Sequence, residues 1–469
     1  MFCLNNESDD MVHSRRDVLK LGAAGAATLL LPNLSFLGPA GAEAHAEDPH
    51  FFLMIVLSGG ADSSYMFDAR PLAMTAAGKI QNYLGQDPAP WTGSNGLITG
   101  ATGLVKPLSP FRDRFSVMNG VVMTPSFDGH AQNMNFLFTG DPFGGDSFIP
   151  HLNLEETGQH GDSVDAIVPG DRPEFTALNH SGVIPLVPKA LRGLPERLRQ
   201  LPPAHAADPL TSFVRSRLDA AAHGDGSFSS GASLMLSALD NSPDVHRKLA
   251  ALSANDPERS AEDQSIALIA DCFRLSLSRA AIYVLPEQFD VHAPELAKAQ
   301  PELFSGAIDK LAVLLRGLAN TPYDAKRSIF DVTTVMIASE FGRTLRAPDM
   351  KVDATGTNHN QYSNSILMGG KGVRGGMVIG ASDMADLAAP ISKAHLAVDP
   401  VLEKTVGLPF DFNTMRPRGD LPETFDVDDY LTIGSVVNTL YSVFNVPKSH
   451  YRKMGRDKQA APVLSGLRS

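Results

Sequence analysis

Short apolar runs alternate with amphipathic segments along most of this chain. Two segments, 263–279 and 301–319, carry apolar residues at the spacing that places them on one face of a helix. Five short apolar runs are predicted as buried strands, at 51–57, 115–123, 280–285, 332–339 and 364–370. Because helices and strands alternate, we predict an α/β fold: a three-layer α/β/α sandwich whose sheet is mainly parallel and covered on both faces.

The segments between these elements have weaker patterns. Residues 141–210 are rich in Gly, Pro and Asp and are predicted as a long irregular stretch, of the kind that is usually functional or packed over a site. Residues 209–256 are predicted as a mostly helical insertion or cap. A short helix is expected within 105–114, a glycine-turned hairpin at 368–380, and a final helix that closes the core within 430–446.

Side chains of the kinds that bind metal ions lie next to the ends of the five apolar runs. Ligands of a doubly wound α/β sheet bind outside the carboxyl ends of its strands, and carboxylates and imidazoles are ligands for divalent metals. Several such residues at equivalent positions indicate one pocket. The candidates are Asp62 after the first run, His130 after the second, Asp290 and His292 after the third, Glu340 after the fourth and His359 before the fifth.

Each candidate also has a purely structural interpretation. Asp62 follows Gly59-Gly60, a turn that permits close backbone approach, and Asp is favoured as the cap of a turn or helix. Glu340 and Arg343 are close enough in sequence to form a structural ion pair at a strand end. The remaining candidates have the alternative of a solvated or packed loop position: His130, Asp290, His292 and His359.

The N-terminus has the pattern of an export signal. Arg15-Arg16 precede the apolar run 21–32, which is shorter than the roughly 20 residues of a membrane span. The pattern resembles a twin-arginine signal. It predicts that residues 1–46 are removed, that 47–469 form a single domain in the periplasm or outside the cell, and that the twin-arginine translocase is a partner during export. A retained membrane anchor and a chance arginine pair are the alternatives.

The composition is that of an acidic globular protein. Of its 469 residues 43% are hydrophobic and 20% charged, and the formal net charge is −12. An acidic chain is a poor candidate for nonspecific nucleic-acid binding, and no second apolar run is long enough for a stable membrane span. Removal of Cys3 with the signal would leave Cys272 alone, which excludes an intrachain disulfide and predicts a buried small hydrophobic side chain.

Five blocks of this sequence resemble one bacterial family. They are LSGGAD at 57–62, DVH at 290–292, SEFGRT at 339–344, TNH at 357–359 and MGGKGVRGGMVIG at 368–380. The family is the exported one catalogued as domain of unknown function 1501, and it resembles a branch of the alkaline phosphatase and sulfatase superfamily. The resemblance covers essentially the whole mature chain. It implies an alkaline-phosphatase-like fold and metal-assisted hydrolysis of phosphate or sulfate esters.

The resemblance also implies metal-binding roles. Asp62 matches the superfamily's first-strand aspartate, and Asp290 and His292 match its Asp-x-His-like pair. Glu340 matches the aspartate position of its Asp-His-Gly turn, and His359 matches the histidine of its Thr-Asp-His-Gly block. The chain departs from the pattern at three positions, one of which is Asn360 in place of the glycine of the block. Phe341 replaces the histidine of the turn, and Asn358 replaces the aspartate of the block.

The nucleophile position is the largest departure from the family. Sulfatases carry the nucleophile at a helix start, nine residues before a Thr-Gly pair, and counting back from Thr139-Gly140 reaches His130. The residue before it, Gly129, has no hydroxyl where the family often has serine. Attack by a metal-activated water or by His130 is therefore expected, with Arg343 holding an anionic oxygen of the substrate.

Two functions follow from this reasoning. The first is an exported metal-dependent hydrolase of small anionic phosphate or sulfate esters, whose mixed histidine and carboxylate ligands suit Zn²⁺ or Mn²⁺ better than Ca²⁺. The alternative is a noncatalytic exported scaffold or binding protein that keeps the fold and has lost the nucleophile. The missing hydroxyl, Phe341 and Asn358 favour the alternative.

Overall fold

The computed structural model describes much of the chain outside its N-terminal segment and one long internal segment. The described residues are 48–76, 83–123, 129–140, 147–152, 166–169, 183–186, 260–345, 357–384, 405–419, 429–454 and 459–469. The predicted signal (1–46) and the predicted helical insertion (209–256) lie outside these residues. None of the described helices is long and apolar enough to cross a membrane.

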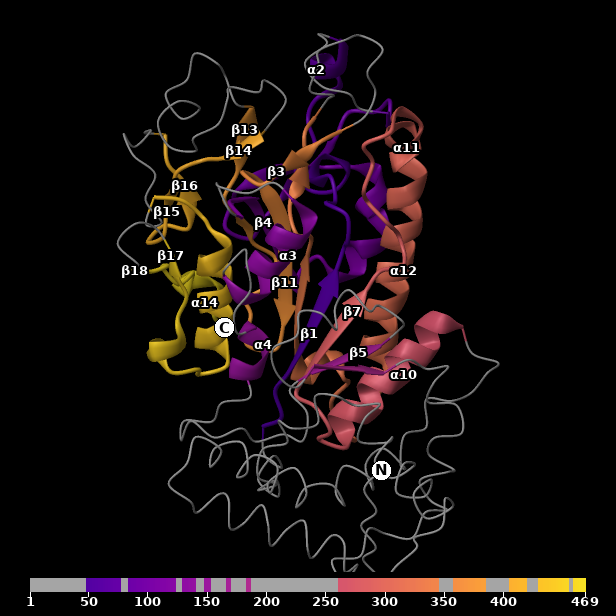
Figure 1. Ribbon diagram of the computed structural model, residues 1–469, viewed down its shortest axis with the longest axis vertical. Helices are drawn as coiled ribbons and strands as arrows, with labels where there is room; N and C mark the ends of the chain where they lie inside the picture. Colours follow the sequence, from indigo (N-terminus) through magenta and orange to yellow (C-terminus); the bar gives the residue numbers. More distant parts are fainter. Residues whose placement is uncertain are drawn as a thin grey trace, which may run out of the picture.

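An eight-stranded sheet forms the middle layer of the fold (Figure 1). Its strands are β1 (Phe51–Val56), β4 (Phe115–Val121), β5 (Ala166–Pro169), β6 (Val183–Leu186), β7 (Ala280–Val284), β8 (Thr333–Ala338), β11 (Asn364–Gly370) and β12 (Val378–Ile379). They lie in the order β12-β4-β11-β8-β1-β7-β5-β6. All neighbours pair in parallel except at β11, which is antiparallel to β4 and β8. The predicted α/β class with a mainly parallel sheet is confirmed.

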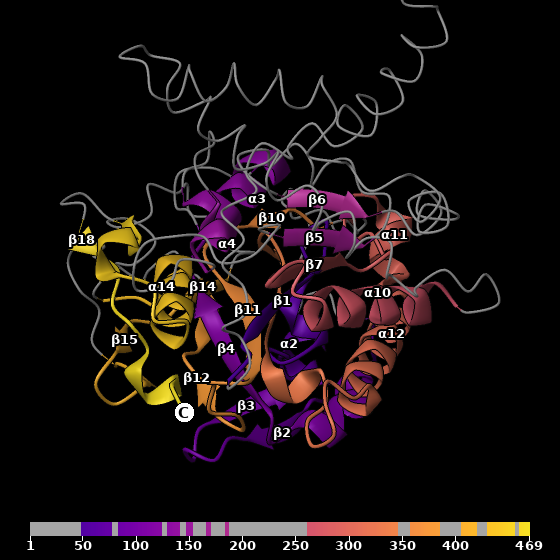
Figure 2. The same cartoon turned by 90° about the horizontal axis from the view of Figure 1, so that it is seen from below.

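Helices cover both faces of this sheet. On one face lie α10 (Ala261–Arg274) and α12 (Gln300–Asn320), and on the other lie α3 (His130–Thr139), α4 (Phe148–His151) and α14 (Ile433–Val443) (Figures 1 and 2). Strand β1 is buried on both sides, and its alternate side chains enter two separate apolar clusters. This explains why its sequence is a continuous apolar run without polar alternation. The three-layer α/β/α sandwich is confirmed.

The two helices predicted from periodicity are present with shifted ends. The first, α10, begins after Ser260, whose hydroxyl accepts a hydrogen bond from the Asp263 amide at 3.0 Å, and it ends at Arg274 before Ser276 at φ 47°. The apolar spacing continues for several residues beyond this turn, which is why the sequence predicts a longer helix. Cys272 is free and buried in α10, where burial raises the pKa of its thiol.

One local prediction is wrong, and another is confirmed with a different helix type. The segment 368–380 is not a hairpin, because β12 pairs in parallel with β4 and lies on the opposite side of β4 from β11. The chain therefore passes across the end of β4 between the two strands. The predicted short helix at 105–114 is present as a 3-10 helix at Gly103–Phe111. It contains Pro107 and Pro110, which lack the amide protons that a regular α-helix requires.

Shorter elements complete the described fold. The helices are η2 (Ser63–Tyr65), α2 (Leu72–Ala76), α11 (Pro294–Lys298), η4 (Phe330–Val332), η5 (Lys448–His450) and η6 (Ser465–Leu467). Paired short strands are β2 (Ala89–Thr92) with β3 (Ile98–Ala101), β9 (Gly342–Arg343) with β10 (His359–Asn360), β13 (Ser382–Met384) with β14 (Thr405–Gly407), β15 (Phe410–Asp411) with β16 (Arg416–Pro417), and β17 (Lys453–Met454) with β18 (Gln459–Ala460).

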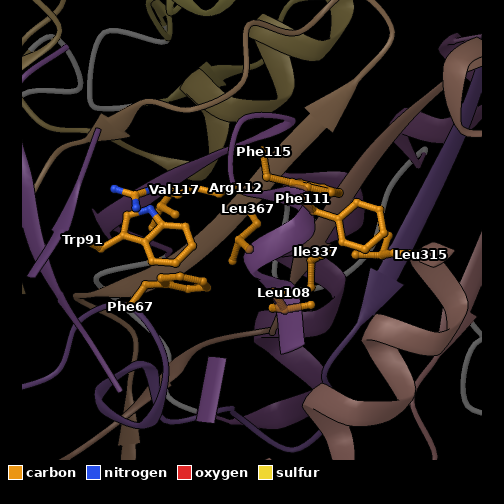
Figure 3. Close-up of a pocket in the computed structure, with 10 residues that line it drawn as sticks. All are labelled: Phe67, Trp91, Leu108, Phe111, Arg112, Phe115, Val117, Leu315, Ile337 and Leu367. Carbon is orange, nitrogen blue, oxygen red and sulfur yellow. The ribbon is translucent and has the colours of Figure 1, made fainter. Parts of the chain in front are cut away.

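A small apolar cavity lies on the α12 side of the sheet (Figure 3). Phe67, Trp91, Phe111 and Leu315 are among its lining residues, and the Arg112 guanidinium lies 4.7 Å from the Trp91 ring centre. Its volume is about 10 Å³, the room of a single water molecule. We regard it as a packing gap in the core.

Candidate metal centre

The sheet topology brings the predicted site residues to one edge. Strands β1, β4, β7 and β8 end at this edge, and β11 begins there because it runs in the opposite direction. His359 lies in β10, just before β11, and so reaches the edge from the other side of the chain. The residues that follow the parallel strands are Asp62 after β1, His130 after β4, Asp290 and His292 after β7, and Glu340 after β8.

Four of these residues form a compact cluster, the His–Asp group: His130, Asp290, His292 and His359. One ligand-type atom from each lies within 4.8 Å of the others. His292 Nε2 is 2.9 Å from His359 Nε2 and 3.0 Å from Asp290 Oδ1. His130 Nε2 is 3.4 Å from the same Asp290 oxygen. These atoms come from α3, from the loop after β7 and from β10.

The His–Asp group is open to solvent. The side chains of Asp290 and His292 are each 46% exposed, and that of His130 is 35% exposed. Water or a small ligand can therefore reach the Asp290 and His292 side chains, whereas the Nε2 atom of His130 is itself buried.

Helix α3 fixes the position of His130 from both of its ends. The helix begins at His130 because Gly129 is extended, at φ −76° and ψ 148°. It ends at Gly140, which adopts the left-handed conformation at φ 77° and donates its amide to Phe136 O at 2.9 Å. The buried Arg452 guanidinium donates to the last carbonyls of the helix, including that of Phe136.

Glu340 lies behind His130 and outside the His–Asp group. Its side chain is 1% exposed. Its Oε1 is 2.9 Å from His130 Nδ1 and accepts the Gly59 amide at 2.8 Å, while Oε2 accepts the Ser339 hydroxyl at 3.0 Å. Among the described ion pairs, the partner of Glu340 is His130, whereas Arg343 pairs with Asp290.

Arg343 is buried beneath Asp290. Its Nη2 donates to Asp290 Oδ1 at 2.6 Å and to Gly59 O at 2.5 Å, and its Nε donates to Gly60 O at 3.0 Å. Its Nη1 lies 3.4 Å from His292 Nε2. The side chain has no exposed surface, so its hydrogen bonds hold the loops of the site in place.

Asp62 has the position of a turn cap. Its Oδ1 accepts the Ser64 amide at 2.9 Å and so caps η2, the structural interpretation of this residue. It is fully buried, and burial raises the pKa of its carboxyl to about 6. Ser63 and Ser64 are also buried. The structure does not bring Asp62 into the His–Asp group, and its predicted metal role stays a prediction.

Two glycines after β1 make room for the site. A β-carbon on Gly59, at φ 106°, would lie 2.6 Å from the Asp290 amide nitrogen. One on Gly60, at φ 76°, would lie 2.1 Å from the ring of Phe341. That ring in turn packs against His130 and His359, with ring centres 4.8 Å and 4.4 Å away. The predicted close approach at the Gly-Gly turn is confirmed.

The surroundings of Asp290 and His292 favour the deprotonated forms of both side chains. Partial burial alone would raise the pKa of Asp290, but the hydrogen bond and charge of Arg343, with His130 and His292, outweigh burial and lower it. Burial and the Arg343 charge lower the pKa of His292. An ionised carboxylate beside a neutral imidazole is the state in which these side chains bind metals.

The donor set fits a divalent transition metal. Three imidazoles and one carboxylate converge, and imidazole suits Zn²⁺, Cu²⁺, Fe²⁺ and Ni²⁺ while carboxylate is accepted by most divalent ions. His130 Nε2 is buried and has no hydrogen-bond partner. A buried polar atom without a partner is costly unless something else satisfies it, and a metal ion at the centre of the group would do so.

These residues are predictable from the sequence, but their relative positions are not. The sequence groups Asp62 and Glu340 with the predicted ligands and sets His130 apart, whereas the structure places His130 in the His–Asp group and Glu340 behind it. The sequence contains no pattern that predicts the packing of the Phe341 ring against the His130 and His359 imidazoles. The backbone carbonyl of Arg374 accepts the Ser116 hydroxyl at 2.7 Å, at the opposite end of β4 from the His–Asp group.

Comparisons with known proteins agree with the sequence blocks over part of the chain. The sequence model of a family described as a protein of unknown function, DUF1501, matches residues 223–405, which is under half of the chain. That segment contains Asp290, His292, Glu340, Arg343 and His359. No curated protein matches the chain in sequence.

Three of the solved structures that match this chain have low sequence identity and TM-scores below 0.5. A lipoteichoic acid synthase from Listeria monocytogenes is 9% identical, with a TM-score of 0.34, and the match covers 74% of this chain and 72% of that one. An alkaline phosphatase superfamily protein from Vibrio parahaemolyticus is 10% identical (TM-score 0.28; 75% and 67% covered). A 2-O GAG sulfatase is 12% identical (TM-score 0.32; 90% and 74% covered).

Proposed function

We propose that this chain is a metal-dependent hydrolase of small phosphate or sulfate esters. Its ligands would be the four members of the His–Asp group. The supporting observation is the convergence of three imidazoles and one carboxylate within 4.8 Å at a solvent-open sheet edge. We propose Zn²⁺ or Mn²⁺ over Ca²⁺, because Ca²⁺ prefers a cage of six to eight oxygens and imidazole nitrogens dominate here.

The chemistry divides between the metal and the chain. A divalent ion bound there would supply Lewis acidity toward the ester oxygen and would lower the pKa of a coordinated water toward 7. The chain's own residues orient the metal-binding side chains and shield them from water. Arg343 holds Asp290 as a carboxylate, Glu340 holds His130, and Phe341 keeps water from the inner side of two imidazole rings.

Attack by water fits this arrangement better than attack by His130. The free nitrogen of His130, Nε2, faces the other ligands, and one lone pair cannot both bind a metal and attack an ester. The nearby serines Ser63 and Ser64 are buried, and Ser126 lies outside the described residues. We therefore assign the sequence-predicted nucleophile position to a ligand and the attack to water.

The test is metal content and ester turnover of the mature protein. We expect protein purified without chelator to carry about one or two divalent transition-metal ions per chain. It should cleave generic phosphate or sulfate esters, lose this activity on chelation and regain it with Zn²⁺ or Mn²⁺ but not with Ca²⁺. A metal-free protein that cleaves neither ester class under any of these ions would contradict the hydrolase and favour the noncatalytic scaffold.

We also propose that the protein is exported through the twin-arginine pathway and acts in the periplasm or outside the cell. The support is the Arg15-Arg16 pair before a short apolar run. Replacing both arginines by lysine should leave the precursor in the cytoplasm, as fractionation and immunoblotting would show. The same conservative change at the exposed Arg316 of α12 is the control and should export normally. The proposal would be refuted if the mature form of the double-lysine variant were found in the periplasm.

A further inference from the structure

Glu340 has the contacts of an orienting residue. Of the polar groups on the described part of the chain, it is the hydrogen-bond partner of the His130 ring, through Oε1 and Nδ1 at 2.9 Å. The same oxygen accepts the Gly59 amide, and the second oxygen accepts the Ser339 hydroxyl. Both carboxylate oxygens are therefore engaged inside the protein, where only 1% of the side chain is exposed.

We propose that Glu340 is a positioning residue which keeps the ring proton of His130 on Nδ1 and so leaves the Nε2 lone pair directed into the His–Asp group. This inference rests on the proposed function, because the positioning of His130 serves metal binding by the His–Asp group. It replaces the sequence-based assignment of Glu340 as a metal ligand. Carboxylates that hold the far nitrogen of a ligating histidine are a general device for fixing its tautomer and orientation.

The tautomer follows from the donors and acceptors present. A carboxylate oxygen only accepts hydrogen bonds, so the nitrogen beside it must carry the proton. A neutral imidazole has a single ring proton, which leaves its other nitrogen as an acceptor. His130 Nε2 is that nitrogen, and it is buried without a hydrogen-bond partner while lying 3.4 Å from Asp290 Oδ1.

The ring orientation is fixed by packing as well as by this bond. Phe341 and His359 lie against the His130 ring with centres 4.8 Å and 4.4 Å away, so the imidazole cannot flip freely. Rotation by half a turn would bring Nδ1 toward the His–Asp group and break the bond to Glu340. Packing against Phe341 and His359 fixes the plane of the His130 ring, and the bond to Glu340 fixes which ring nitrogen faces the His–Asp group.

Glu340→Gln is the discriminating variant. Its side-chain oxygen can still accept from both the Gly59 amide and His130 Nδ1, because both donors point at one atom. The amide nitrogen would then face the Ser339 hydroxyl, which can accept. This variant keeps the geometry and loses the charge. Glu340→Met removes the acceptor as well, with a side chain of similar length.

Two measurements test the proposal. Nitrogen-15 NMR of metal-free protein near pH 8, where an ordinary histidine is neutral, should show the His130 proton on Nδ1 in the wild type and in Glu340→Gln, but not held there in Glu340→Met. The His130 signal is assigned by its loss in His130→Gln. Zn²⁺ titration calorimetry should show affinity weakened by about 10-fold in Glu340→Gln and toward 100-fold in Glu340→Met.

The results separate this proposal from the proposed function. A wild-type proton on Nε2 would overturn it, as would a Glu340→Gln loss of Zn²⁺ affinity as large as that of His292→Ala, which would make Glu340 a ligand. An unchanged absorption spectrum of the Co²⁺-loaded Glu340→Gln protein would support an intact ligand set. The tautomer is read without any metal, so it decides the positioning role even where the protein proves not to bind metal.

Discussion

His292→Ala is expected to abolish stable metal binding while leaving the fold nearly intact. His292 Nε2 lies 3.0 Å from Asp290 Oδ1 and 2.9 Å from His359 Nε2, at the centre of the donor set. We expect Zn²⁺ affinity to fall by more than the roughly 10–100-fold that loss of an outer-sphere partner costs. Its half-exposed ring contributes little packing, so the free energy of unfolding of the metal-free protein should change by about 1 kcal/mol or less.

The measurements are Zn²⁺ titration calorimetry and thermal unfolding with and without added ion. Wild-type protein should be stabilised by Zn²⁺ through mass action, and the variant should not. His450→Ala is the matched control, because His450 is also partly exposed but packs against His151, away from the His–Asp group. If Zn²⁺ stabilised the wild type and His292→Ala equally, the ion would not bind through His292 in the His–Asp group, and the prediction would be wrong.

Gly59→Ala is expected to cause the largest loss of stability and to disorganise the site. Gly59 has φ 106°, and its β-carbon would lie 2.6 Å from the Asp290 amide nitrogen and 2.7 Å from that of Phe289. Those are backbone atoms, which cannot move aside as a flexible side chain can. Strained backbone alone costs on the order of 1–3 kcal/mol. With the steric overlap, we expect about 3 kcal/mol or more off the free energy of unfolding.

The site should also be disturbed beyond the loss of stability, because Gly59 is hydrogen-bonded to two residues that contact the His–Asp group. Its amide donates to Glu340 and its carbonyl accepts from Arg343. Denaturant unfolding and Zn²⁺ titration would check both effects. Gly85→Ala is the control: Gly85 has φ 64°, but no atom lies within 4 Å of its added β-carbon. It should cost only about 1–2 kcal/mol and leave Zn²⁺ affinity unchanged. Equal costs at the two glycines would contradict the overlap argument.

The strands could be predicted because their burial leaves a direct mark on the sequence. Strand β1 is buried on both faces and reads as FFLMIV without polar interruption. Strand pairing has no such mark. The glycines of 368–380 suggested a hairpin, but β12 instead pairs with β4, more than 250 residues earlier in the chain. Such long-range pairing depends on how the whole sheet assembles.

The chemical groups of the site, and the sheet edge at which they gather, were predictable from the sequence alone. Side chains that follow parallel strands must reach one edge of the sheet, so Asp62, His130, Asp290, His292 and Glu340 were identifiable from their positions alone. Spacing along the chain cannot say which of them face one another across that edge. It could not distinguish a member of the His–Asp group from the residue behind it.

The relative positions of these side chains depend on the tertiary fold. Glu340 turns inward to the Gly59 amide and His130 Nδ1, and Asp62 turns inward to cap η2, while His130 Nε2 turns outward to Asp290. The physical reason is that a buried carboxylate must find hydrogen-bond donors. Gly59 and Ser64 amides and the His130 ring are donors that only the folded chain brings within reach.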